Sequence, residues 1–442
     1  MSMLQVIAVA ITIGLNALDG FDVLAISFAA PGIAEEWGIN RAELGIVLSM
    51  ELVGMAIGSI ALGGLADRIG RRPTILACLV VMTGGMLMVP SATGMLELSV
   101  WRVLTGLGIG GMLAAINAAA AEFSNSKRRD LNVSLMAIGY PVGAVLGGLV
   151  VAQLLKFYEW RSIFYFGGLV TALFIPLVLL FVPESVHWLS QKQPKGALDK
   201  INRTLTRMGH PTITALPVVT ETQRKQSATG IFTRGLILTT ILVTLAYFLH
   251  ITTFYFILKW VPKIVVDMGF AASSAAGVLT WANVGGATGG AVLGLLAQRY
   301  NVKALTIGVL IISTVMVTVF GHVEADLAQI SLICACAGFF TNAGVVGLYA
   351  ILARAFPTHV RGSGTGFAIG TGRGGSVLAP MLGGFLFAAG FELPSVAFII
   401  SAGSLIAAAA LFFLKLSPDI DGGTSTANAA TDPAVTPAPA TR

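Results

Sequence analysis

Twelve long apolar runs constrain this chain more than any other feature. A helix needs about 20 apolar residues to cross a hydrocarbon core of about 30 Å. The runs lie near residues 4–30, 43–63, 73–91, 96–121, 131–153, 163–182, 236–258, 272–296, 304–320, 327–352, 363–387 and 395–414. They are continuously apolar and do not alternate, so they favour membrane helices over a membrane barrel. Only 11% of the 442 residues are charged, which excludes an ordinary soluble protein.

The basic residues predict how the chain is oriented. If the N-terminus is inside, the loops and tail on that side carry 20 of the 27 Lys and Arg residues. Arg102 and Arg373 fall within spans. The opposite loops carry Arg41, Lys156, Arg161, Lys259 and Lys263. This asymmetry predicts a multi-pass protein of the cytoplasmic (inner) membrane with both termini in the cytoplasm.

One long polar stretch divides the chain into two halves. Residues 184–235 are expected to form a cytoplasmic central loop between six-helix bundles at 1–183 and 236–416, while the Ala-, Thr- and Pro-rich tail at 417–442 is expected to be disordered. A shift of 231 residues carries Gly63–Arg68 onto Gly294–Arg299, and Ala137–Gly139 onto Ala368–Gly370. We therefore expect an all-α membrane protein whose two bundles are related by pseudo-symmetry, with a site between them.

Two motifs resemble those of a known transporter family. The segment Gly63-x-Leu65-Ala66-Asp67-Arg68-x-Gly70-Arg71-Arg72 resembles the loop motif of the major facilitator superfamily, and Arg102 followed by Gly106, Gly108, Gly110 and Gly111 resembles a second motif. This resemblance extends to about Leu416, and it implies the major facilitator fold and alternating access.

A third motif narrows the resemblance. Asp19-Gly20-Phe21-Asp22 is similar to the signature of the aromatic acid:proton symporters. Glu122, Arg361 and Arg373 also fall where that family places functional charges. Gln298, where an acid is usual, and Glu51, an additional acid in the second span, depart from the pattern.

Charges within the spans are the candidates for proton coupling. A charge at mid-membrane is costly, so it usually faces protein or water. Asp19 and Asp22 lie on one helix face, and helix counting puts Asp22, Glu51 and Arg102 at similar depths. Two adjacent carboxylates favour protonation of one, while an adjacent Arg favours ionisation. We expect Asp22 to carry the proton, Asp19 or Glu51 to tune it, and Arg102 to alternate as partner; a static ion pair is the alternative.

Arg373 is the candidate for binding an anion. It lies near the middle of its span beside Gly372, Gly374 and Gly375, which are expected to leave room next to it, and the second-half spans contain no acid to neutralise it. A planar guanidinium suits a carboxylate. The alternative is that Arg373 binds carbonyl groups and positions the neighbouring spans.

Further polar and aromatic residues are candidates for contact with substrate. His250 occupies the position of Asp19 under the 231-residue shift, and it could relay protons or form part of a cavity wall. Asn283 and Asn342 could orient a substrate or link helices. Aromatic candidates are Phe21, Tyr255 and Trp281, although most aromatic residues in spans serve packing or anchoring.

The charges of the first motif are expected to act as a gate. Ion pairs at helix ends can form in one conformation and break in another. The residues expected in this role are Gly63, Asp67, Arg68, Arg71, Arg72, Glu122 and Arg361. The alternative for the arginines is that they only set the membrane topology.

These features favour a proton-coupled importer of an organic anion, and the resemblance to the aromatic acid:proton symporters implies an aromatic carboxylate such as hydroxybenzoate, protocatechuate or benzoate. A drug:proton antiporter and a sugar-type porter, the latter suggested by Pro183-Glu184-Ser185, are alternatives of the same fold. No metal cluster, nucleotide loop or nucleophile arrangement is recognisable, so we expect no enzyme activity, no cofactor and no metal site. The expected partners are a small organic anion, protons and the lipid bilayer, with no nucleic acid, and we expect a monomer.

Overall fold

The computed structural model describes residues 1–62, 64–125, 127–216, 232–233, 235–357 and 360–414, and within these ranges it contains helices and no strands. The long helices of the first half are α1 (Met3–Trp37), α2 (Arg41–Ala61), α4 (Arg71–Met88), α5 (Met95–Glu122), α6 (Arg129–Leu154) and α7 (Arg161–Phe181). Those of the second half are α10 (Ile237–Asp267), α11 (Ala272–Leu296), α12 (Val302–Phe320), α13 (Leu327–Ala355), α14 (Arg361–Ala388) and α15 (Leu393–Phe413). Among described residues, eleven of these helices are long and apolar enough to span a membrane. The twelfth, α14, is 28 residues long, but Arg373 and its many glycines lower its hydropathy.

Local sequence signals set the helix ends. Ser2 caps α1 in a reciprocal arrangement with Gln5, and Gly38 ends that helix in the left-handed conformation, with φ of 61°. Asn40 and Glu43 then form a second capping box at the start of α2. The connection between the two helices is consequently very short, which holds α1 and α2 antiparallel.

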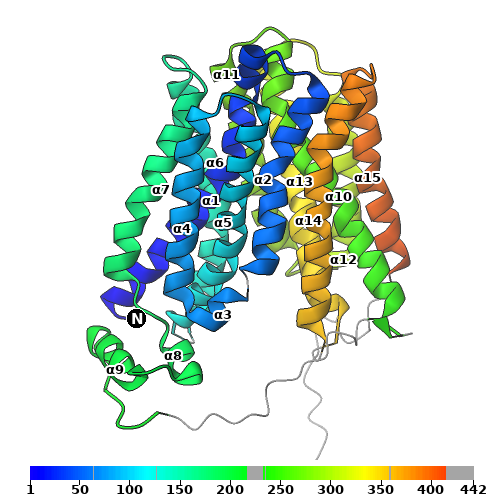
Figure 1. Ribbon diagram of the computed structural model, residues 1–442. Helices are drawn as coiled ribbons and strands as arrows, with labels where there is room; N and C mark the ends of the chain where they lie inside the picture. Colours follow the sequence, from blue (N-terminus) through cyan, green and yellow to red (C-terminus); the bar gives the residue numbers. More distant parts are fainter. Residues whose placement is uncertain (63, 126, 217–231, 234, 358–359, 415–442) are drawn as a thin grey trace, which may run out of the picture.

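The two halves repeat one packing scheme. In the first half α1 packs against α6 and α7, while α2 and α4 pack against α5. In the second half α10 packs against α14 and α15, while α11 and α12 pack against α13. Figure 1 shows the two bundles side by side, with α7 and α15 at opposite edges. The predicted fold, two pseudo-symmetric six-helix bundles, is confirmed.

Glycines allow the closest helix contacts. A Cβ on Gly143 of α6 would meet the backbone carbonyl oxygen of Ala17 in α1, and a Cβ on Gly20 would meet that of Tyr140. A side chain at either position would separate α1 from α6. Gly139, Gly143 and Gly147, spaced four residues apart on α6, therefore let α6 pack closely against α1.

The bundles meet chiefly on one side of the membrane. We call the side where α1 begins the N-side, and the side where it ends, near Trp37, the far side (Figure 1). Towards the far side, Gly45 of α2 lies against the backbone of Pro380 and Gly384 in α14, and the Ser49 hydroxyl donates to the Val377 carbonyl oxygen at 2.8 Å. Closer to the N-side, a Cβ on Gly366 or Gly370 of α14 would meet nothing within 4 Å. The conformation is thus closed on the far side.

Two sequence expectations about connections need correction. Helix α10 continues to Asp267, so Lys259 and Lys263 lie in the helix and not in a far-side loop as predicted. Apolar residues continue past Lys259, which lengthens the span. The central connection contains two helices, α8 (Val186–Lys192) and α9 (Ala197–Arg207), and the loop motif contains α3 (Leu65–Ile69), while Val89–Ser91 forms the short helix η1.

Some predicted features cannot be placed. Gly63 and the tail at 417–442 lie outside the described residues, and so does the side chain of Arg361, whose backbone begins α14.

Candidate functional site

Four predicted proton-coupling residues lie together inside the first bundle. Asp19 and Asp22 are on α1, Glu51 is on α2 and Arg102 is on α5, and each side chain is at most 2% exposed. The Arg102 guanidinium forms an ion pair with Glu51 and donates a hydrogen bond to the Asp22 backbone carbonyl oxygen at 2.9 Å. Asp19 and Asp22 are close enough to repel each other electrostatically. The structure therefore places these four charges in one buried cluster.

Lys259 of α10 joins this cluster from the second bundle. Its Nζ lies 3.6 Å from a carboxylate oxygen of Glu51 and donates to the backbone carbonyl oxygen of Val23. Its side chain is fully buried. Sequence analysis missed this residue because the predicted span ended at residue 258; the continuing apolar sequence after Lys259 was the signal that could have revealed it. Glu51 consequently has cationic partners from both bundles.

Two carboxylates in the cluster lack hydrogen-bond donors. Neither oxygen of Asp19 or Asp22 accepts a hydrogen bond from the described residues. Leaving a buried carboxylate without donors is unfavourable, and a bound proton or a ligand donor would relieve the penalty. The positive charge of Arg102 also acts on the Asp22 carboxylate. The arrangement is suited to taking up and releasing a proton.

Arg373 of α14 approaches the same cluster from the second bundle. It is partly exposed, and its charge acts on Asp19 and on Tyr255. No carboxylate of the described residues lies within 4.0 Å of its guanidinium, so its hydrogen-bonding capacity is available to a ligand. The expectation that the adjacent glycines leave room beside it was wrong for Gly372 and Gly375, which pack against Tyr247 and Phe248. These glycines bring α14 close to α10.

Several tyrosines lie near Arg373, and its charge acts on Tyr247 and Tyr255. Tyr255 of α10 packs against the core of the first bundle, as does Tyr140 of α6, and the two phenol groups interact. Tyr247 and Tyr349 share a hydrogen bond of 3.0 Å. Tyr140, Tyr255 and Arg373 thus bring aromatic surface and positive charge together where the bundles meet.

Two other candidate substrate-binding residues, His250 and Phe21, are buried inside the bundles. His250 is fully buried, and its ring nitrogens lie 2.8 Å from the Ser404 hydroxyl and 2.8 Å from the Thr341 carbonyl oxygen, so it links α10, α13 and α15. Phe21 packs edge-to-face on Phe166 inside the first bundle. Both residues therefore have contacts within their own bundle.

The candidates on α11 and α13 also bind neighbouring groups. Asn342 donates to the Gly286 carbonyl oxygen at 2.6 Å and links α13 to α11, while Asn283 donates within its own helix to Leu279 at 2.8 Å. Trp281 is 55% exposed and shares a helix face with Thr288 and Leu295, which are also exposed. The structure does not bring Trp281 to the charged cluster; its helix face is suited to contact with lipid.

The charges of the loop motif form a network on the N-side. Arg71 donates to Glu122 at 3.0 and 3.3 Å, to Asp67 at 2.8 Å and to the Ala66 carbonyl oxygen at 2.8 Å. Arg72 donates to the Leu179 carbonyl oxygen at 2.6 Å, while Arg68 is exposed. The network ties α3, α4 and α5 together at the end of the first bundle.

Glu184 completes this network from the central connection. Its carboxylate accepts from the backbone N–H groups of Arg71 and Ser185, each at 2.9 Å, and so caps the start of α4. Gly70, with φ of 110°, leaves the space that Glu184 occupies. Burial raises the pKa of Glu184 above its ordinary value of 4.5, and the backbone hydrogen bonds oppose that shift. The Pro183-Glu184-Ser185 motif therefore has a structural role that does not depend on the cargo.

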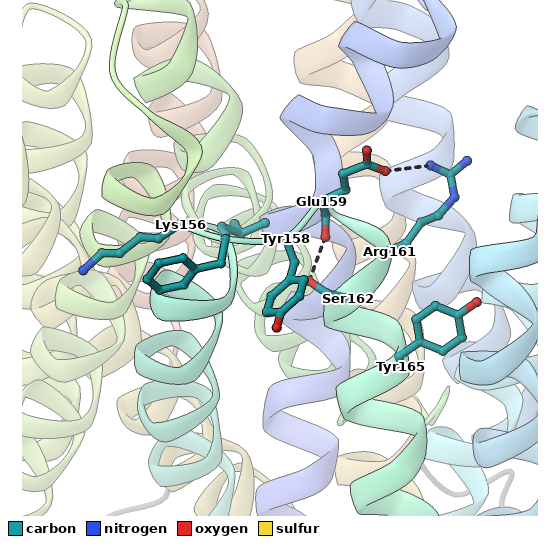
Figure 2. Close-up of a pocket in the computed structure, with 8 residues that line it drawn as sticks. Lys156, Tyr158, Glu159, Arg161, Ser162 and Tyr165 are labelled. Carbon is teal, nitrogen blue, oxygen red and sulfur yellow. Dashed lines mark hydrogen bonds and ion pairs between the residues drawn. The ribbon is translucent and has the colours of Figure 1, made fainter.

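An open surface pocket of about 620 Å³ lies elsewhere, at the α6–α7 connection on the far side. Figure 2 shows its lining, with Glu159 3.8 Å from Arg161 and accepting a hydrogen bond from Ser162. Arg161 also binds both carboxylate oxygens of Glu36 at 2.6 and 2.7 Å. None of the predicted site residues lines this pocket, so it is separate from the charged cluster.

Comparison with known proteins identifies the family. The model of the Major Facilitator Superfamily matches residues 12–335 and 243–440. The chain belongs to the major facilitator superfamily. The predicted resemblance is thus confirmed, and the chain is a multi-pass membrane protein of a transporter family.

Individual relatives within the superfamily align with this chain over most of their length. The gallate transporter of Pseudomonas putida is 29% identical over 379 residues, which cover 85% of this chain and 84% of that protein. The 4-hydroxybenzoate transporter PcaK of the same species is 29% identical over 385 residues, or 86% and 85% of the two chains. Among solved structures, a D-xylose-proton symporter superposes with a TM-score of 0.72 at 19% identity, covering 94% of this chain and 98% of that one. That likeness shows the shared major facilitator fold.

Proposed function

We propose that this superfamily member imports an aromatic carboxylate together with protons, by alternating access. The observation that carries the proposal is the position of Arg373, a cation of the second bundle whose charge acts on Asp19 in the acidic cluster of the first. An arginine of this kind binds a carboxylate, Tyr140 and Tyr255 provide aromatic surface, and the adjacent acids take up the proton. The relatives named as gallate and 4-hydroxybenzoate transporters support an aromatic acid as cargo.

In this proposal the N-side is cytoplasmic, and the protein lies in the cytoplasmic membrane as a monomer with both termini inside. The conformation described above, closed on the far side, is then the inward-facing state. Opening of the far side requires α2 to separate from α14 and Glu51 from Lys259. The N-side network around Arg71 stabilises one end of the first bundle during that exchange.

The direct test is uptake into proteoliposomes with and without an imposed pH gradient. The panel contains 4-hydroxybenzoate, gallate, protocatechuate and benzoate, with xylose and a cationic dye as representatives of the sugar and drug classes. We expect accumulation of one or more aromatic acids that depends on an acidic exterior, and acidification of the lumen during uptake. Accumulation of xylose or efflux of the dye would contradict the proposal.

The matched variant for proton coupling is Asp22→Asn. It removes one titratable carboxylate and preserves size, and it should abolish accumulation driven by the pH gradient. If Asp22→Asn still concentrates substrate under that gradient, Asp22 is not the proton carrier.

A further inference from the structure

Among the residues that the structure describes, the interiors of the membrane helices contain three acidic and three basic side chains. They are Asp19, Asp22 and Glu51 with Arg102, Lys259 and Arg373. Five of the six are at most 2% exposed, and Arg373 is partly exposed. In the described part of the chain, every other charged side chain on a membrane helix lies within about one turn of a helix end. When all six are ionised, the set has no net charge.

The balance exists only when the two bundles are together. The first bundle contributes three acids and one base, and the second contributes the two bases Lys259 and Arg373. Glu51 lies between Arg102 of its own bundle and Lys259 of the other, and Asp19 is acted on by Arg373. The titratable and charged groups that interact with Glu51 are Asp19, Asp22, Arg102, Tyr140, Tyr255 and Lys259, while Arg373 acts on Asp19 and Tyr255. Lys259 and Arg373 together balance the set, and Lys259 is the one of the two that contacts an acid of the first bundle directly.

Charge balance restricts which forms of the transporter, empty or loaded with a proton, a carboxylate or both, can pass through the closed state. Enclosing a net charge in a medium of low dielectric constant is unfavourable, whereas a neutral set of paired charges is tolerated. The empty set is neutral. A proton alone makes it positive, and a carboxylate alone makes it negative. A proton and a monocarboxylate together restore neutrality, so the empty and doubly loaded forms can pass through the closed state.

We propose that these six charges, completed by Lys259, couple one proton to each monocarboxylate and make transport electroneutral. This inference rests on the proposed function, because it assumes that the cargo is an organic anion carried with protons. It adds the stoichiometry, and it assigns Lys259 as a positioning residue for Glu51.

The stoichiometry is measured with the full-length protein in proteoliposomes and radiolabelled 4-hydroxybenzoate. At one proton per anion, an opposing gradient of about one pH unit balances about a tenfold anion gradient. The balance point should not move when a potassium diffusion potential is imposed with valinomycin. Vesicles containing Arg373→Gln report passive permeation of the neutral acid. Proton-driven uptake with two protons per anion, or with a voltage-dependent balance point, overturns this inference and leaves the proposed function intact, whereas no protein-dependent uptake of any aromatic acid overturns the proposed function itself.

A compensating pair of substitutions tests the role of Lys259. In Glu51→Gln the empty set is positive and cannot close, but the anion-loaded set is neutral without a proton. This variant should therefore exchange internal for external 4-hydroxybenzoate while losing proton-driven accumulation. Adding Lys259→Gln restores balance with two acids and two bases, and it should restore accumulation. A merely structural role of Lys259 would make the double variant worse than the single one.

A second pair keeps the test decisive if Glu51→Gln does not fold. Asp19→Asn removes one negative charge in the same way and keeps the proton carrier Asp22, so Lys259→Gln should again restore accumulation. Exchange measured in the same vesicles reports that each variant is folded. If neither double variant accumulates substrate better than its parent single variant, the proposal is wrong.

Discussion

Arg71 at the start of α4 binds Glu122 at the end of α5 through two hydrogen bonds, of 3.0 and 3.3 Å, and both side chains are largely buried. A hydrogen bond to a charged group contributes about 1.5–3 kcal/mol when it is shielded from water. The same arginine also contacts Asp67, whose side chain is 71% exposed. The two acids therefore differ in burial while they share a partner.

This difference predicts different outcomes for Glu122→Gln and Asp67→Asn. Glu122→Gln should lower the midpoint of thermal unfolding in detergent by several degrees, because Arg71 loses its buried partner. Asp67→Asn should change that midpoint little, because exposed ion pairs contribute about 0–1 kcal/mol, yet it should slow uptake if Asp67 acts in gating. Equal midpoints for the two variants would contradict the structural assignment.

Arg373→Lys tests whether the guanidinium geometry is needed. Lysine keeps the positive charge but cannot bind a carboxylate with two parallel hydrogen bonds. We expect the apparent KM for an aromatic acid to rise at least about tenfold, corresponding to about 1.4 kcal/mol. Unchanged affinity in the lysine variant would favour a role in positioning helices.

Tyr255 and Trp281 form a matched pair of aromatic residues. Tyr255 lies between the bundles near Arg373, whereas Trp281 is exposed on the outer face of α11. Tyr255→Leu should raise the KM for aromatic acids several-fold, and Trp281→Leu should leave it within about twofold, as measured by initial uptake rates. A larger effect at Trp281 would show that its helix face contacts substrate.

Gly143→Ala tests the close contact between α1 and α6, and Gly370→Ala in α14 is its matched control. A Cβ at Gly143 meets the Ala17 carbonyl oxygen, while a Cβ at Gly370 of α14 meets nothing within 4 Å. Forcing the first pair of helices apart should cost about 1–3 kcal/mol, as overpacking does in other cores. Gly370→Ala should not lower the unfolding midpoint. Equal stability of the two variants would rule out the close approach.

The raised pKa of Glu184 predicts a pH dependence of stability. Because the folded state binds this proton more tightly than the unfolded state, the contribution is complete below the ordinary value of 4.5 and is lost as pH rises through the higher folded value. The unfolding midpoint of the wild type should therefore decline from about pH 4.5 upwards more steeply than that of Glu184→Gln, which retains an acceptor oxygen. Parallel pH profiles would contradict the assignment.

Hydropathy and motif spacing were sufficient to predict the twelve helices, the duplication and the superfamily. The cluster of Asp19, Asp22, Glu51 and Arg102 could also be predicted, because charged residues within the spans are few and their depth follows from helix counting. The position of Lys259 could not be predicted, because a charged residue near the end of an apolar run is readily assigned to a loop. The orientation of Trp281 could not be predicted either, since sequence does not indicate which face of a hydrophobic helix meets lipid.

Helices α8 and α9 are fastened to the first bundle by side-chain hydrogen bonds, from Trp188 to the Asp67 carbonyl oxygen at 3.1 Å and from Arg207 to that of Leu180 at 3.0 Å. Asn202 extends this attachment to Ile213 through two further hydrogen bonds of 2.9 Å. Ile213 and Leu216 also pack against Trp188, Leu189 and Ile201, so the central connection stays attached to the first bundle as far as Leu216. We therefore expect two separately synthesised polypeptides, divided after Leu216, to fold independently and to reassemble through the surfaces that α2 and α6 present to α14 and α11.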